Sequence, residues 1–349
     1  MRRIYLGLFI FSCVYLLAVP ECFSQGQEER EEKMIREMER LKAQEVENAY
    51  KAAENTQRRP LTPRVSCRVS VFSGYDSNVN LDTKRKGDVF ESILFSLDYR
   101  KPITEDIKFT FDYDLYALNY NEYTDTSSIL DHFRLGLQKK FSPFVIGTGY
   151  DLGMLYYPYN EDGDFLLHKG FVYLGQDILK RIYHQIQFEA GLKDYTNKKA
   201  LLDTIDTYQD EKRQDKRLGV EYRLGSLVNR RLRLSFRTMF LVNDSNARYV
   251  DFYDYKAYQA SSGFDYAILG NLYLISNFSY LRKNYNSRTV TLKDYRQRDN
   301  LYAGSLGLKC KVNEKNSMSL VYSYRENSSN DSLEEYSGNM ITCGWQYNF

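Results

Sequence analysis

Charged side chains recur at every second position along the chain, and their chemistry is the binding and steering of ions. In the segment 107–119, IKFTFDYDLYALN, Asp112 and Asp114 alternate with large apolar side chains. A period of two predicts a β-strand with one polar and one apolar face. Charges on that polar face suit a water-filled interior, since an unpaired charge in a dry core is very costly. The residues predicted to line this interior are Asp98, Asp112, Asp114, Asp151, Arg134, Arg217, Arg223, Arg233, Arg237, Lys309 and Arg325.

The order of these charges along the chain allows two interpretations. The acidic members precede residue 152, whereas most of the basic members follow residue 216. Opposed acidic and basic arcs across a wet lumen would orient polar solutes and tune ion selectivity. Alternatively, the charges pair across neighbouring strands and brace the wall. The sequence leaves both interpretations open.

The spacing of possible nucleophiles and bases does not indicate an active site. The three histidines are His132, His168 and His184, and none stands two residues from a serine. We expect each of them to be a rim or lumen residue. No zinc-like spacing or glycine-rich phosphate loop is visible. We therefore expect no catalytic residue, no cofactor and no metal site, although a lipid-modifying barrel enzyme stays an alternative.

The elements that would position the charges are strands, and we expect them to close into a barrel. Roughly fourteen alternating segments of about ten residues follow residue 65, which is the length of a tilted membrane strand. Short connectors alternate with longer polar ones, and 195–215 and 284–299 are predicted to be the longest loops. The segment 165–176, FLLHKGFVYLGQ, fits either parity. The predicted fold is an antiparallel up-and-down transmembrane β-barrel of about 14 strands spanning 65–349, because closure removes exposed strand edges.

Composition agrees with strands that meet lipid. The chain has 32 Tyr, 20 Phe and one Trp, an aromatic share of 15%. Tyrosine favours membrane–water interfaces, so we expect girdles at the strand ends. The apolar runs beyond the N-terminus are too short for a membrane helix. The formal net charge of +2 argues against a nucleic-acid partner.

The N-terminal region predicts export. Residues 1–24, MRRIYLGLFIFSCVYLLAVPECFS, read as a signal peptide cleaved near Ser24. An uncleaved anchor and a lipoprotein signal modified at Cys22 are the weaker alternatives. Residues 25–64 are expected to be a periplasmic helix and linker, with the helix over 28–53. That helix is either a solvated stalk or a docking element for a periplasmic partner.

The C-terminal strand carries a resemblance to a known class of proteins. In GWQYNF, Trp345, Tyr347 and Phe349 occupy alternate positions. This pattern resembles the C-terminal assembly signal of bacterial outer-membrane β-barrels, which implies recognition by the barrel-assembly machinery and contact with outer-membrane lipid and lipopolysaccharide. The run GYDSN at 74–78 weakly resembles the first strand of exopolysaccharide export porins and surface-lipoprotein assembly modifiers. The expected location is the cell outer membrane. The expected function is a porin that passes hydrophilic solutes or an exported polymer, with a surface-display or assembly barrel as the alternative.

The cysteines give no disulfide framework. Cys67, Cys310 and Cys343 remain after the predicted signal peptide, an odd number without metal-like spacing. We expect them to be small lipid-facing residues, and a Cys67–Cys343 bridge is the weaker alternative.

Overall fold

The fold is described by a computed structural model for residues 62–160, 163–178, 181–204, 207–249, 251–290 and 293–349. The predicted signal peptide and the predicted helix at 28–53 lie outside the described residues. No helix within the described ranges is long and apolar enough to cross a membrane.

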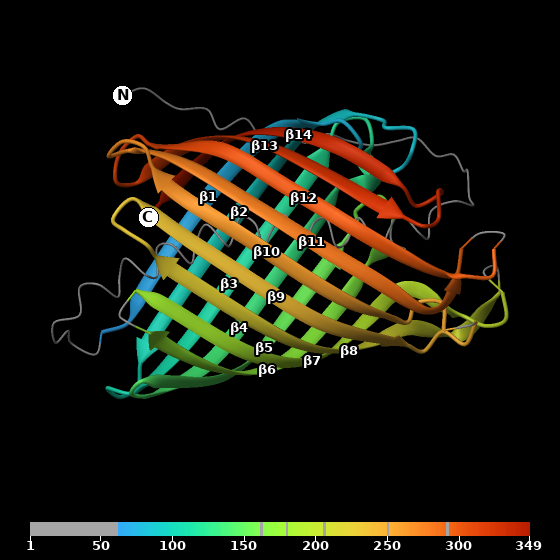
Figure 1. Ribbon diagram of the computed structural model, residues 1–349, viewed down its shortest axis with the longest axis horizontal. Coiled ribbons are helices and arrows are strands. Elements are labelled where there is room, and N and C mark those ends of the chain that lie inside the picture. Colours follow the sequence, from blue (N-terminus) through green and yellow to red (C-terminus); the bar gives the residue numbers. More distant parts are fainter. Residues whose placement is uncertain (1–61, 161–162, 179–180, 205–206, 250, 291–292) are drawn as a thin grey trace, which may run out of the picture.

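The described residues form one closed antiparallel barrel of 14 strands (Figure 1). Each strand pairs with its neighbours in sequence, and β1 pairs with β14 to close the sheet. One turn of 3₁₀ helix, η1 (Thr124–Thr126), lies between β3 and β4. The predicted architecture is confirmed. The strands are β1 (Arg64–Asp76), β2 (Asp88–Pro102), β3 (Ile107–Tyr120), β4 (Ser128–Phe141), β5 (Phe144–Tyr156), β6 (Phe165–Ile178), β7 (Ile182–Leu201), β8 (Tyr208–Leu227), β9 (Leu232–Ser245), β10 (Tyr255–Ala267), β11 (Leu272–Thr289), β12 (Arg296–Lys311), β13 (Asn316–Ser329) and β14 (Tyr336–Asn348).

Side-chain exposure alternates along the strands and separates an outward face from an inward one. On β2, Ile93 is 50% exposed whereas the adjacent Leu94 is 3% exposed. The same contrast settles the parity of 165–176, because Phe171 is buried and Val172 is exposed. An outward face of exposed large apolar side chains is what a membrane-spanning barrel presents to lipid.

The two ends of the barrel differ in their connections, as predicted. Short connections such as 142–143 and 268–271 lie at one end, here called the turn end. Longer ones such as 77–87 and 246–254 lie at the other end, here called the loop end. Because the strand number is even, β1 begins and β14 finishes at the turn end.

Two predicted long loops are wrong. β7 continues to Leu201 and β8 begins at Tyr208, so most of 195–215 is strand. Likewise β11 continues to Thr289 and β12 begins at Arg296. Both extensions pass irregularities in register and then resume pairing. Polar composition identified these segments as solvated, but backbone hydrogen bonds can continue in a strand that has left the lipid.

The last strand lies where its alternation predicts. Ile341 and Trp345 are exposed on the outward face of β14, next to β1. The register sets Cys343 opposite Ser73, six residues along β1 from Cys67. The three described cysteines are free, so the Cys67–Cys343 bridge is wrong.

Candidate functional site: the barrel lumen

All eleven charged residues predicted for the interior lie on the inward face of their strands. Each has the same parity as a buried side chain on its own strand, as Arg134 has with Leu130 and Asp151 with Leu155. They come from eight strands: β2 (Asp98), β3 (Asp112 and Asp114), β4 (Arg134), β5 (Asp151), β8 (Arg217 and Arg223), β9 (Arg233 and Arg237), β12 (Lys309) and β13 (Arg325). Their role in lining a solute path stays a prediction.

The early acidic residues are held by nearby cations. Arg100 Nη2 lies 2.9 Å from Asp98 Oδ1, and its Nη1 lies 2.5 Å from Asp112 Oδ1. Further along the barrel, Asp151 Oδ2 lies 3.3 Å from Lys169 Nζ on β6 and 3.7 Å from Arg134 Nη1 on β4. These contacts join adjacent strands.

The later basic residues are held in the same way. Glu221 on β8 is contacted by Arg223 of its own strand through Oε1. Its Oε2 lies 2.5 Å from Arg237 Nη2 on β9. Arg217 Nε donates to Asn243 Oδ1 at 2.9 Å. These contacts favour bracing of the wall over two separated arcs of charge.

Accessibility of the inward side chains falls from the turn end to the loop end. Near the turn end, the Arg100 and Arg223 side chains are 36% and 37% exposed. Near the loop end, Arg213 and Asp215 are fully buried and are joined by bonds of 2.7 and 2.9 Å. The Arg213 guanidinium also lies 3.4 Å from the centre of the Tyr253 ring. In its turn half the lumen is therefore accessible to water beside these arginines, although Arg68 and Ser317 are buried near the same end, and its loop end is closely packed.

The β1–β2 loop contributes apolar residues to this packing. Val79 packs against Phe90 and Tyr120, on β2 and β3. Leu81 is 5% exposed and packs in a cluster that includes Leu281 and Leu301, on β11 and β12. In the circular strand order, β3 and β11 lie nearly opposite each other. The loop thus takes part in two apolar clusters, one on β2 and β3 and one that extends over β10–β12 and β14. We call residues 77–87 the plug loop.

Two plug-loop residues have strained backbones. Leu81 and Arg85 have positive φ angles of 54° and 51°. Such a conformation costs of order 1–3 kcal/mol for a residue other than glycine, and it persists where surrounding contacts over-determine it. The burial of Leu81 supplies such contacts.

A polar latch holds the base of the plug loop. Arg325 Nη2 donates to Asp76 Oδ1 at 2.7 Å and to the Asn78 carbonyl at 2.6 Å. Tyr120 OH donates to Asp76 Oδ2 at 2.8 Å. Asn78 Nδ2 donates to the Ser337 carbonyl at 3.0 Å. The latch ties together β1, β3, β13, β14 and the plug loop.

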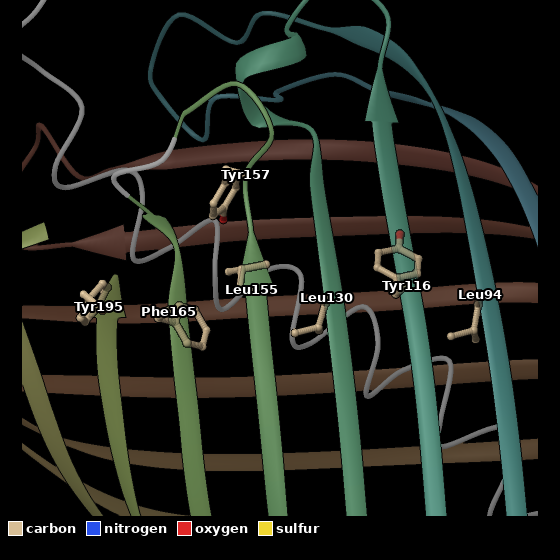
Figure 2. Packing of buried hydrophobic residues seen from close by; sticks show 7 residues of the cluster. All are labelled: Leu94, Tyr116, Leu130, Leu155, Tyr157, Phe165 and Tyr195. Carbon is tan, nitrogen blue, oxygen red and sulfur yellow. The ribbon is translucent and has the colours of Figure 1, made fainter. Parts of the chain in front are cut away.

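An apolar row lies on the inner wall between the accessible half and the loop end (Figure 2). Its members come from neighbouring strands and project from the same side of the sheet. They are Leu94, Tyr116, Leu130, Leu155, Phe165 and Tyr195, with Tyr157 from the β5–β6 connection. This row forms the boundary between the water-accessible part of the lumen, in the turn half, and the packed loop end.

A cavity of about 160 Å³ opens on the inner wall in the turn half. Its charged lining residues, among the described part of the chain, are three arginines. The lining is Arg100, Thr110, Arg134, Gly136, Gln138, Phe171, Tyr173, Gln185 and Arg223. A second cavity of about 10 Å³ lies beside Arg68 and Lys309, which is roughly room for one water.

The histidines are divided between the two faces. His132 faces inward, with Nδ1 3.7 Å from Asp114 Oδ2 and Nε2 3.4 Å from Asp151 Oδ1. His168 and His184 face outward instead, so neither lies in the lumen, although His184, the third residue of β7, lies near the turn-end rim. Tyr150 OH lies 2.6 Å from His168 Nδ1, which gives that imidazole a polar partner on the apolar face.

Sequence reasoning missed several cavity residues. Arg100 shares the parity of Asp98 and is detectable by alternation alone. Phe171 and Tyr173 lie in the segment whose parity was ambiguous. Gln138 and Gln185 carried no local signal, because an uncharged amide on a polar face is unremarkable in any strand. Val79 and Leu81 likewise lie in a loop, where apolar residues follow no period.

No protein-family model matches the chain, and no curated protein matches its sequence. Among solved structures, the outer membrane channel DcaP of Acinetobacter baumannii resembles it with a TM-score of 0.51 at 10% identity, over 82% of this chain and 97% of that one. OmpT of Vibrio cholerae, as expressed in the outer membrane, matches with a TM-score of 0.48 at 10% identity, over 84% and 99%. An anion-selective porin from Comamonas acidovorans gives 0.47 at 8% identity, over 82% and 99%. The likeness concerns the fold, which is that of outer-membrane β-barrel proteins.

Proposed function

We propose that this outer-membrane β-barrel is a channel for hydrophilic solutes, without catalysis, and that the plug loop closes it at the loop end. Solutes would enter the turn half, which faces the periplasm if the barrel inserts as outer-membrane barrels do. Movement of the plug loop would then connect this vestibule to the outside.

The observation that supports this proposal is the graded accessibility of the inward charges. Arg100, Arg223 and Arg237 brace the wall through ion pairs, yet their side chains remain 36%, 37% and 24% exposed. Charged side chains on an aqueous lumen wall set ion selectivity and interact with polar solutes. The packing around Leu81 and the latch at Asp76 explain how such a lumen stays closed at rest.

Planar-bilayer recording tests the proposal. We expect low steady conductance from the wild-type barrel and a many-fold higher conductance when residues 79–86 are replaced by a short Gly-Ser linker. A matched replacement of the exposed residues 103–106 in the β2–β3 turn should leave the conductance near that of the wild type. A folded plug-loop variant that conducts no better than the wild type would reject the channel and favour a surface-display or assembly barrel.

The remaining contacts of the protein are proposals as well. The outward apolar face would contact outer-membrane lipid, and the rim at the loop end would meet lipopolysaccharide. The barrel-assembly machinery would recognise the C-terminal signal formed by Trp345, Tyr347 and Phe349. A periplasmic partner for the 28–53 segment stays a prediction.

A further inference from the structure

We infer that the 160 Å³ cavity in the turn half is a binding site for a hydroxylated carboxylate, of the size of one sugar acid. This inference deepens the proposed function by assigning a solute class to the vestibule. It rests on the channel proposal only for its biological use, because binding at equilibrium requires no flux.

The anion-binding groups are guanidiniums that face the cavity. Carboxylates hold Arg100, Arg134 and Arg223, but none of these carboxylates is among the described residues that line the cavity. Arg100 is held by two carboxylates and serves mainly as an anchored part of the wall. A solute therefore meets Arg134 and Arg223, and guanidinium pairs with carboxylate through strong, directional hydrogen bonds.

Arg134 and Arg223 have capacity beyond their present contacts. Arg134 Nη2 donates to Gln187 Oε1 at 3.2 Å, whereas its Nη1 is 3.7 Å from Asp151, a carboxylate that Lys169 approaches more closely, at 3.3 Å. Arg223 shares Glu221 with Arg237. The Arg223 side chain is also the more exposed of the two. An incoming carboxylate would thus find donors that are only partly used.

The neutral lining suits hydroxyl groups. Gln138, Gln185 and Thr110 present amide and hydroxyl groups around the arginines, and Tyr173 OH donates to Gln138 Oε1 at 3.0 Å. Amides and hydroxyls both donate and accept, as a polyhydroxylated solute requires. A simple inorganic anion would leave most of these groups without a use.

Two aromatic rings complete the lining. The Phe171 and Tyr173 rings are nearly parallel, with an interplanar angle of 19° and centroids 6.4 Å apart. Arg134 lies over the Phe171 ring, 4.0 Å from its centre. Gly147 makes room for the Tyr173 ring, because a Cβ there would lie 2.2 Å from Tyr173 Cζ. The ring is therefore positioned by the neighbouring strand to offer an apolar contact to the C–H groups of a sugar acid.

The size of the cavity restricts the solute. A volume of 160 Å³ holds on the order of ten water-sized positions, at about 10–15 Å³ each. That is room for one ring-sized unit, and because the cavity opens to the lumen, the rest of a longer chain can lie outside it. The source of the unit is either a free acid or an acidic polymer, and the binding experiment distinguishes these two sources.

The test is calorimetric titration of the refolded full-length barrel in detergent with glucuronate, glucose, inorganic phosphate and trigalacturonate. We expect saturable binding of glucuronate and at least tenfold weaker binding of two probes: glucose, which carries no charge to pair with the arginines, and phosphate, which has no carbon ring to contact Tyr173. Tighter binding of trigalacturonate would assign the site to a polymer unit, and equal binding would assign it to the free acid.

Two variants and one control locate the site. Arg134→Gln should weaken glucuronate binding about tenfold or more. Gly147→Ala, which displaces the Tyr173 ring, should weaken it without any change of charge. Arg233→Gln removes an inward arginine that is not part of the cavity lining and should bind normally. Heat-dependent mobility on electrophoresis checks that each variant forms a barrel.

The results separate this inference from the channel proposal. Equal binding of glucose and glucuronate, phosphate binding as tight as that of glucuronate, or equal losses in Arg134→Gln and Arg233→Gln would overturn the site. Normal glucuronate binding in a barrel that never conducts would support the site and reject the channel.

Discussion

Arg325 on β13 holds the carboxylate of Asp76, the last residue of β1, across the intervening strand β14. The bonds from Arg325 Nη2 to the two Asp76 oxygens are 2.7 and 2.9 Å long. Asp76 is fully buried, and the two residues are 249 positions apart in the chain. The pair lies beside the seam where the barrel closes and at the base of the plug loop. It therefore connects barrel closure to the position of that loop.

Loss of this pair should release the plug loop. Arg325→Gln leaves Asp76 buried without its cation, which typically destabilises a protein by about 3–5 kcal/mol. We expect faster tryptic cleavage after the exposed residues Lys84, Arg85 and Lys86. Arg298→Gln, at an exposed position of β12, is the control and should be cleaved like the wild type. An unchanged cleavage rate in Arg325→Gln would mean that the pair does not restrain the loop.

The buried pair Arg213–Asp215 allows a double-mutant test of the packing at the loop end. Arg213→Met should lower the urea midpoint of unfolding, because Asp215 then keeps a buried charge without its closest cation, although Lys193 and Arg217 remain nearby. The double variant Arg213→Met/Asp215→Leu should recover much of that loss, since an apolar pair of similar volume is often neutral. Equal midpoints for the single and double variants would contradict a dry environment for this pair.

The β9–β10 connection should make stability depend on pH through Asp254. Burial, together with the nearby carboxylates Asp244, Asp251 and Asp215, raises the pKa of Asp254 from 3.8 to about 6, although the Ser245 N–H bond opposes the shift. The folded state therefore binds the proton more tightly than the unfolded state, so stability falls as pH rises from about 4 to 6.

Asp254→Asn tests this dependence while keeping an oxygen that can accept the Ser245 N–H bond. We expect the thermal midpoint of the variant to change less between pH 4.5 and pH 7 than that of the wild type. The variant should be the more stable of the two at pH 7. Parallel pH profiles for both proteins would assign the dependence to other groups.

Phe349 offers a test of assembly. Its backbone N–H donates to the Cys67 carbonyl at 3.0 Å, and its ring packs edge-on against Tyr347 with centroids 4.8 Å apart. We expect Phe349→Ala to reduce the amount of folded barrel in the outer membrane while export across the inner membrane continues. Fractionation with a heat-mobility assay measures both. Leu320→Ala, an outward substitution on β13, is the control for a simple loss of lipid contact.

The sequence by itself determined the barrel, its approximate strand number and the face on which most side chains lie. Alternation is a local property, because successive side chains of a strand point to opposite faces whatever the partner strands are. The outward position of Ile341 and Trp345 and the inward position of Asp112 and Arg223 follow from that period. The parity of 165–176 did not, since apolar residues there occupy both faces.

Only the tertiary structure decided which inward residues meet. The cavity draws its lining from β2, β3, β4, β6, β7 and β8, and its members come together through strand pairing and the curvature of the sheet. The plug loop takes part in an apolar cluster on β2 and β3 and in another over β10–β12 and β14, because closure brings these strands within reach of one loop. The period of a strand tells which side of the sheet a residue occupies. The register and closure of the sheet determine what that residue contacts there.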